Sequence, residues 1–140
     1  MGKRRIRNLL FHKISKDKIF GFDISRERCQ ETHEKYGVDT FSNFKEALRV
    51  ITPDVYIIST SPRHHQPYFL HAARNKKHFF VEVGTIKKGY KELKTLLDDS
   101  FVVAPSCTPR FYQPIIMIKK ILEEDKIGKI LSFQYHMGQY

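Results

Sequence analysis

The sequence has few cysteines and no long apolar run. No stretch of about 18 or more apolar residues occurs, and the basic residues at the start are not followed by an apolar segment, so neither a membrane-spanning helix nor a secretory signal is predicted. Cys29 and Cys107 lie far apart without a Cys-x-x-Cys pattern, which argues against a disulfide or zinc framework and indicates free thiols. Repeats and low-complexity segments are also lacking. These absences predict a cytoplasmic protein that does not contact a membrane.

Acidic residues are in short supply as well. The 140 residues include 15 Asp and Glu against 25 Lys and Arg, which gives a net charge of +10. Such an excess attracts phosphates and acidic partners, yet the basic residues are spread along the chain, mostly as pairs near the ends of predicted elements. The aromatic residues Phe20, Phe22, Phe79 and Phe80 fall in predicted buried strands and not on an exposed stacking face. We therefore interpret the charge as solvated helix surface and expect no nucleic-acid binding.

What the sequence does contain is an alternation of short apolar runs with amphipathic segments. The strongest strand signal is VYIIST at 55–60, a β-branched run bounded by Pro53-Asp54 and Ser61-Pro62. Strands are predicted at 18–23, 38–41, 55–60, 78–83, 101–106 and 129–138, and helices at 1–15, 25–37, 42–52, 66–75, 87–98 and 110–125. Apolar strands that alternate with helices predict an α/β fold with a doubly wound parallel sheet. The strand at 129–138 alternates in polarity and is of a different, half-exposed kind.

The opening MGKRRIRNLL places four basic residues directly behind Gly2. The predicted pattern thus begins with a helix, whereas a doubly wound sheet of the dinucleotide-binding type begins with a central strand and a glycine-rich turn that seats the pyrophosphate on the first helix. Gly2 stands at the start of this helix. Asp23 ends the next predicted strand, close to the spacing of about 20 residues from that turn to the carboxylate that binds ribose hydroxyls. This pair alone is a weak pattern, because most Asp residues after strands are caps.

Further segments follow in a recognisable order. They are MGKRRIRNL at the first helix, GFD at 21–23, Tyr36-Gly37-Val38, FSNFKEAL at 41–48, PDVYIISTSP at 53–62, His65, HFFVE at 78–82, Arg110-Phe111 and Ile127-Gly128-Lys129-Ile130. This order resembles the N-terminal domain of the glucose-fructose oxidoreductase and inositol dehydrogenase (Gfo/Idh/MocA-like) family. The resemblance implies a Rossmann-like NAD(P)-binding domain at 1–126 and the start of a second, α+β substrate and oligomerisation domain at 127–140. MGKRRIRNLL then corresponds to the end of a GxGxxG turn and its helix, with Gly2 as the third glycine.

The resemblance also implies that parts of the family fold lie outside this sequence. The first strand and the first two glycines would precede Met1, and most of the substrate domain would follow Tyr140. Without a strand in the middle of the 3-2-1-4-5-6 order, two half sheets with exposed edges are left. We therefore expect a Rossmann sheet lacking its first strand, a fragment that tends to aggregate, and no dehydrogenase activity from this fragment.

The family binds NAD(P) at the carboxyl edge of the sheet and exchanges hydride with a sugar, cyclitol or related alcohol. Carried over residue by residue, the resemblance implies a cofactor site made of Gly2 at the pyrophosphate, Asp23 at the adenosine ribose, the loop residues Thr60, Ser61 and Pro62, His65 near the nicotinamide ribose, and Glu82. An Asp at 23 favours NAD, whereas Arg26 and Arg28 nearby keep NADP open. For His65 and Glu82 a purely structural role is an equal alternative.

One motif departs from the family pattern. The chain reads Glu82-Val83-Gly84 where the family has Glu-Lys-Pro, whose lysine sets the substrate hydroxyl for proton transfer. Because valine can neither donate a proton nor carry a charge, the acid–base chemistry loses a member. Lys87 and Lys88 lie where the next helix should start, so we do not assign them the role, and no catalytic residue is predicted. The alternative function is a non-catalytic binding or interaction protein that kept the fold and lost the lysine.

The expected partners follow from these observations. They are a nicotinamide dinucleotide, a sugar-like substrate in intact relatives, and a second copy of the chain through the sheet that 129–138 would begin. A metal site at His64, His65 and His71 is disfavoured, because no carboxylate or cysteine joins them at ligand spacing.

Overall fold

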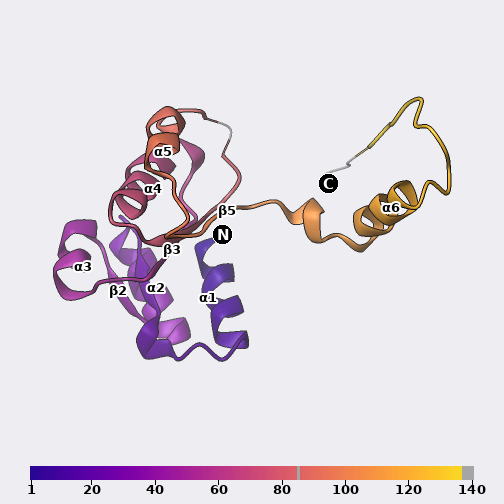
Figure 1. Ribbon diagram of the computed structural model, residues 1–140. Coiled ribbons are helices and arrows are strands. Elements are labelled where there is room, and N and C mark those ends of the chain that lie inside the picture. Colours follow the sequence, from indigo (N-terminus) through magenta and orange to yellow (C-terminus); the bar gives the residue numbers. More distant parts are fainter. Residues whose placement is uncertain (85, 137–140) are drawn as a thin grey trace. The chain divides into compact units, whose positions relative to one another are not determined.

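The computed structural model describes residues 1–84 and 86–136 (Figure 1). The chain divides into two compact units, the first covering Met1–Ser106 and the second beginning at Cys107. The predicted domain boundary after residue 126 concerns the start of a second domain, and it stays a prediction. Among the described residues, no helix is both long and apolar enough to cross a membrane.

The first unit alternates helices and strands. Its elements are α1 (Gly2–Phe11), a 3₁₀ turn (Lys16–Lys18), β1 (Phe20–Phe22), α2 (Arg26–Tyr36), β2 (Asp39–Phe41), α3 (Phe44–Val50), β3 (Val55–Ile58), a 3₁₀ turn (Pro62–His64), α4 (His65–Arg74), β4 (His78–Val81), α5 (Tyr90–Leu96) and β5 (Val103–Pro105). The alternating pattern predicted from sequence is therefore confirmed in this unit.

The strands form two separate parallel sheets. In one, β1 pairs with β2, with Phe20 opposite Asp39. In the other, the order is β3-β4-β5, with Val55 opposite His78 and Phe79 opposite Val103. Within the described ranges, no strand pairs with the second edge of β1 or of β3. This is the order of a doubly wound sheet with its central strand left out, and it confirms the α/β class.

Local sequence signals set the helix ends. The Ser25 hydroxyl accepts a hydrogen bond from the Arg28 backbone N–H at 3.3 Å, and Gly37 ends α2 at φ 64°, a left-handed conformation that glycine adopts without strain. The side chain of Asn43 accepts from the backbone N–H groups of Lys45 and Glu46, at 2.9 and 3.3 Å, and so begins α3. The helix predicted at 42–52 thus begins behind Asn43 in the structure.

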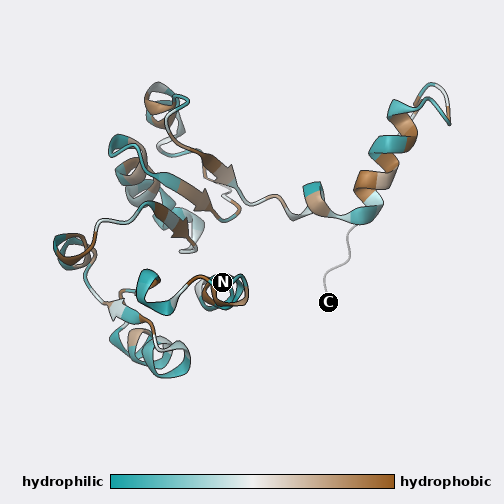
Figure 2. Cartoon of the chain, turned by 60° about the horizontal axis from the view of Figure 1, so that its bottom comes forward, coloured by the Kyte–Doolittle hydropathy of each residue, from teal (hydrophilic) through white to brown (hydrophobic). Residues whose placement is uncertain are grey.

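The apolar core lies between α4, α5 and the three-stranded sheet, whose strands are mostly brown in Figure 2. Phe69 on α4 and Phe79 on β4 are almost completely buried, and their rings lie nearly parallel with centroids 6.4 Å apart. Ala72 and Ala73 are fully buried, which lets α4 approach the sheet closely. This packing holds the loops after β3 and β4 on a rigid support.

An aromatic cluster links the two sheets. Phe22 of β1, Phe44 of α3, Tyr56 of β3, and Tyr68 and His71 of α4 form it, with ring centroids 5.1 to 6.5 Å apart and mostly edge-to-face geometry. Such pairs contribute about 0.5–1.5 kcal/mol each beyond their buried area. The side chains of this cluster therefore connect elements that no backbone ladder joins.

The second unit contains a 3₁₀ turn at Thr108–Phe111 and the helix α6 at Gln113–Glu123. The strand predicted at 129–138 is wrong over 129–136, where the structure has no strand; residues 137 and 138 lie outside the described residues. Alternating polarity specifies a strand only where a neighbouring strand pairs with it, and the described residues provide none here.

Candidate functional site

The predicted site residues follow three parallel strands of the first unit. Asp23 follows β1, the segment from Thr60 to Pro62 follows β3, and Glu82 follows β4. In an open α/β sheet, ligands bind in the crevice outside the carboxyl ends of the strands. Gly2 begins α1, and a Cβ placed on it would meet nothing within 4 Å, so the chain itself leaves the space at this helix start open. A ligand that approaches the backbone closely would explain a glycine there.

The loop after β3 holds two buried hydroxyl groups. Among the described residues, Ser59 Oγ and Thr60 Oγ1 are buried and have no hydrogen-bond partner. Buried polar atoms in native proteins are almost always paired, so each exception needs an explanation, such as a water or a ligand. Thr60 was one of the predicted residues, whereas Ser59 was missed because burial of a hydroxyl cannot be inferred from its type.

His65 lies at the start of α4 and is 3% exposed. Its Nε2 is 2.8 Å from the carbonyl oxygen of Thr60, which can only accept, so Nε2 carries the proton. This bond ties the loop after β3 to α4, as expected for the structural interpretation of His65. The neighbouring Ser61 and His64 form a second contact, with Ser61 Oγ 2.9 Å from His64 Nδ1.

Asp23 is partly engaged by its own loop. Its Oδ1 accepts from the Ser25 backbone N–H at 2.9 Å, and its Oδ2 lies 3.7 Å from the Arg28 guanidinium. The side chain is 37% exposed, so it remains reachable by a ligand. Burial, and then the charge of Asp23, raise the pKa of Tyr68 on α4. Asp23 thus closes the turn ahead of α2, whose N-cap is Ser25, and Arg28, one of the two arginines that leave NADP open as an expectation, lies beside it.

Glu82 has a partner that the sequence did not indicate. The Nε and Nη2 atoms of Arg5 on α1 lie 2.7 and 2.6 Å from Glu82 Oε1, and the guanidinium carbon is 4.5 Å from the centre of the Phe80 ring. The Glu82 side chain is 12% exposed. The sequence showed Arg5 only as part of a basic run, and the separation of 77 positions between the partners left no local signal.

In the segment Glu82-Val83-Gly84, the space beside Gly84 is taken by a neighbouring side chain. A Cβ on Gly84 would lie 2.8 Å from the Tyr90 hydroxyl and 3.7 Å from His65 Nδ1. Tyr90 therefore fills the space above Gly84, and its ring packs against Phe69 at 5.6 Å. Val83 is 62% exposed. Tyr90 is a second residue that sequence reasoning missed.

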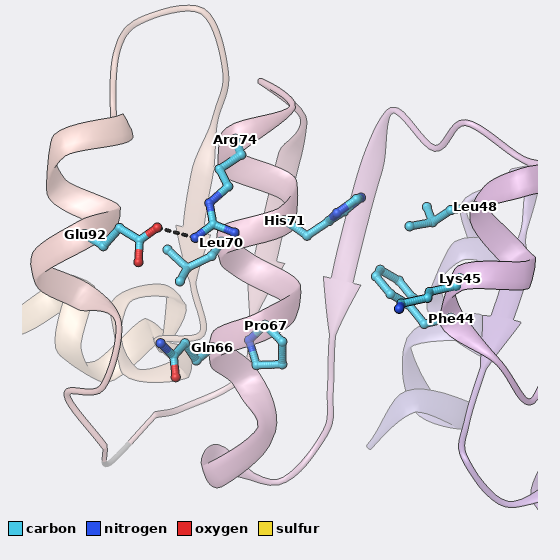
Figure 3. Close-up of a pocket in the computed structure, with 9 residues that line it drawn as sticks. All are labelled: Phe44, Lys45, Leu48, Gln66, Pro67, Leu70, His71, Arg74 and Glu92. Carbon is cyan, nitrogen blue, oxygen red and sulfur yellow. Dashed lines mark hydrogen bonds and ion pairs between the residues drawn. The ribbon is translucent and has the colours of Figure 1, made fainter.

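The surface has two hollows near these elements. One, of about 550 Å³, lies between α3, α4 and α5 and is lined by Phe44, Lys45, Leu48, Gln66, Pro67, Leu70, His71, Arg74 and Glu92 (Figure 3). None of the predicted site residues lines it. The other, of about 440 Å³, is lined by Ser61, Pro62, Arg63, His64 and Ile86 and so includes two predicted residues. We therefore place the candidate site at the loops after the strands and not in the larger hollow.

The structure thus brings some of the predicted residues together. Thr60, His65 and Glu82 gather at the ends of β3 and β4, because His65 bonds Thr60 and the Glu82 backbone N–H donates to the Ile58 carbonyl at 2.9 Å. Arg5 connects α1, and with it Gly2, to this group. Asp23 lies apart, directly after β1, and no hydrogen bond between described residues joins it to the loops after β3 and β4.

Comparisons with known proteins bear on this arrangement. A family model described as an oxidoreductase family with an NAD-binding Rossmann fold matches residues 1–100. A comparison with curated proteins finds no match.

Several solved structures share the fold. The WlbA dehydrogenase from Chromobacterium violaceum, in complex with NADH and UDP-GlcNAcA, superposes with a TM-score of 0.78 at 16% identity, covering 91% of this chain and 38% of that one. A probable dehydrogenase from Thermotoga maritima superposes with a TM-score of 0.72 at 21% identity, covering 89% of this chain and 39% of that one. The myo-inositol 2-dehydrogenase from Lactobacillus plantarum superposes with a TM-score of 0.68 at 19% identity, covering 80% of this chain and 34% of that one. The chain therefore spans less than two fifths of each of these neighbours.

Proposed function

The chain belongs to the Gfo/Idh/MocA oxidoreductase family, with its NAD-binding Rossmann fold, and on that premise we propose that its first unit carries the NAD(H) site of such an enzyme. The observation that carries the proposal is the pair of buried hydroxyls, Ser59 Oγ and Thr60 Oγ1, which have no partner among the described residues. They follow β3 at the carboxyl edge of the sheet, where a dinucleotide would pair them. A buried hydroxyl left unpaired costs about 1–3 kcal/mol, so a polar ligand there stabilises the loop.

The roles of the other residues follow from their positions. Gly2 leaves room for the pyrophosphate at the start of α1, whose N-terminus favours an anion. Asp23 accepts from the adenosine ribose hydroxyls through its exposed part. The segment 60–62, His65 and Glu82 line the nicotinamide end. A bound nicotinamide would accept or deliver the hydride, while these residues bind and orient the nicotinamide.

We further propose NAD as the preferred cofactor. The Asp23 carboxylate would repel the 2′-phosphate of NADP. Arg28 lies 3.7 Å from Asp23 and weakens that repulsion, so NADP binds, but less tightly. The variant Asp23→Ala should reduce the preference, and Glu27→Gln, an exposed acidic residue in the first turn of α2, is the matched control.

For the whole protein we propose hydride transfer to or from a sugar, cyclitol or related alcohol, and for the 140-residue chain no turnover. Val83 stands at the family's lysine position, and a valine has no proton to give. The second edges of β1 and β3, with which no strand of the described residues pairs, also favour weak cofactor binding by the 140-residue chain alone.

The test is calorimetry with NAD⁺, NADH and NADP⁺. It compares the chain with a version that carries a β-strand and a GxGxxG turn in front of Met1. We expect the extended version to bind NADH more tightly than NADP⁺ and the chain alone to bind weakly and aggregate. A well-folded extended version that binds no dinucleotide would overturn the proposal. Tight NAD binding by the chain alone, as a cooperatively melting monomer, would refute the weak binding proposed for the 140-residue chain.

A second candidate is a non-catalytic binding protein with the same fold. Two observations favour it. The Tyr90 hydroxyl lies 2.8 Å from where a Cβ at position 84 would stand, and Val83 is exposed. The two candidates separate in an NADH oxidation assay on the longest version that binds NADH, with a panel of keto-sugars and keto-cyclitols. Turnover with Val83 in place excludes the non-catalytic candidate, whereas binding without turnover supports it.

Location and assembly complete the proposal. We propose a cytoplasmic protein, since both cysteines are free thiols, Cys29 buried and Cys107 exposed. We propose a homo-oligomer for the whole protein. Light scattering after size-exclusion chromatography tests the assembly, and a monomer at all concentrations would contradict it.

A further inference from the structure

Arg5 differs from the other basic residues at the start of the chain. Its side chain is 25% exposed, and it reaches the end of β4. Lys3 pairs instead with Glu31 on α2, while Arg4 and Arg7 are exposed. The basic run is thus not a uniform surface, since one of its members belongs to the inner side of α1.

The contact between Arg5 and Glu82 has the geometry of a fixed pair. Two guanidinium nitrogens lie 2.6 and 2.7 Å from the same carboxylate oxygen, Oε1, and the flat face of the group stacks on Phe80. Charge-assisted hydrogen bonds of this length are about twice as strong as neutral ones. The stacking removes rotational freedom from the arginine, so Glu82 is held in one orientation.

The other carboxylate oxygen of Glu82, Oε2, can accept from a different hydrogen-bond donor. Within the described ranges 1–84 and 86–136, both side-chain contacts of Glu82 fall on Oε1. An ionised carboxylate has about four lone-pair sites, so Oε2 can accept from a hydroxyl group. The Glu82 backbone donates to Ile58, directly before the buried hydroxyls of Ser59 and Thr60. Glu82 and these hydroxyls therefore follow neighbouring strands, β4 and β3, at the same edge of the sheet.

We propose that Arg5 is a positioning residue of the cofactor site, which holds Glu82 so that Oε2 accepts a hydrogen bond from the ribose on the nicotinamide side of the dinucleotide. The inference rests on the proposed function.

The test compares three probes on the extended version: ADP, ADP-ribose and NADH. ADP lacks the second ribose, so its affinity reports on the pyrophosphate and adenosine end alone. We expect Arg5→Gln and Glu82→Gln to lower the affinities for ADP-ribose and NADH by about 10- to 100-fold, the range of a lost hydrogen bond to a charged group. The affinity for ADP should stay unchanged. Arg5→Lys should recover part of the loss. Arg4→Gln and Arg7→Gln remove the same charge from exposed positions of α1 and are the matched controls.

The outcomes separate the inference from the proposed function. If the unchanged extended version binds neither ADP nor NADH, the proposed function fails and the inference fails with it. Suppose instead that it binds both. If Arg5→Gln then lowers the affinity for ADP as much as that for NADH, or lowers neither affinity, the inference alone is overturned. A melting curve of each variant checks folding. Where Arg5→Gln does not fold, Glu82→Gln and Arg5→Lys decide, and an unchanged NADH affinity in both would overturn the proposal.

Discussion

The two halves of the first unit are stabilised in different ways. The half around β3, β4 and β5 has a continuous apolar core; in the described part of the chain, its nine buried members all lie between Ile58 and Phe101. The half around β1 and β2 buries few side chains, among them Ile19, Cys29 and Val38, and relies on helix caps and exposed ion pairs. Exposed ion pairs contribute about 0–1 kcal/mol each. In chain order, the half around β1 and β2 is the first half and the half around β3, β4 and β5 is the second. The first half therefore depends on the second for its stability, through the aromatic cluster that joins them.

The largest expected effect comes from the core of the second half. Phe69→Ala removes a side chain that is 1% exposed and should lower the free energy of unfolding by about 3–5 kcal/mol. Val38→Ala, in the first half, should cost about 2 kcal/mol. Chemical denaturation measures both, with Phe11→Ala, at an exposed position, as the control. If Val38→Ala were as damaging as Phe69→Ala, the halves would not differ as described.

The next effect tests the contact between Gly84 and Tyr90. Gly84→Ala places a methyl group 2.8 Å from the Tyr90 hydroxyl and should lower stability by about 1–3 kcal/mol through overpacking. Tyr90→Phe removes that hydroxyl, so the double variant should recover most of the loss. Thermal melts of the four proteins form a double-mutant cycle. Additive losses would show that Tyr90 does not fill the space above Gly84.

A smaller effect concerns the helix α3, which lies between the halves. Asn43→Ala removes the side chain that caps the helix and should lower stability by about 1 kcal/mol. Ser42→Ala is the matched control, because the neighbouring serine makes no cap contact in α3. Equal losses in the two variants would contradict the assignment of the cap to Asn43.

The smallest effect is a pH dependence of the cluster that links the halves. Burial, and then the charge of Arg74, lower the pKa of His71. The folded state therefore binds a proton less readily than the unfolded one. Stability is fully present above the unfolded pKa of about 6.5 and falls as the pH drops below it through the folded pKa.

His71→Phe checks this dependence while keeping a ring beside Phe44 and Tyr56. Melting temperatures measured between about pH 7.5 and 5 should fall less steeply in this variant than in the unchanged chain. Identical slopes would remove His71 as the cause.

The features predicted correctly from sequence depend on local signals. The helix predicted at 25–37 and the strand predicted from the apolar run at 55–60 depend on signals within a few residues, and the structure has α2, which begins behind the Ser25 cap and ends at Gly37, and β3. Thr60 and Glu82, which the resemblance named for the cofactor site, follow β3 and β4 in the structure, and their role stays a prediction. The strand at 129–138 failed over its described part, since alternating polarity needs a partner strand that the sequence of one segment cannot reveal.

The features that were missed depend on contacts between distant elements. Arg5 and Glu82 are 77 positions apart, and neither residue type indicates the other. Ser59 attracts notice only when its hydroxyl is seen to be buried without a partner. Tyr90 looked like an ordinary helix residue until the space above Gly84 was known. Such sites are formed by tertiary packing, so periodicity and spacing do not report them.

The contact between Gly84 and Tyr90 also makes these two positions epistatic. A Cβ at residue 84 would lie 2.8 Å from the Tyr90 hydroxyl, so a larger residue at 84 requires Tyr90 to shift or to change. The effect of a substitution at residue 84 therefore depends on which residue stands at position 90.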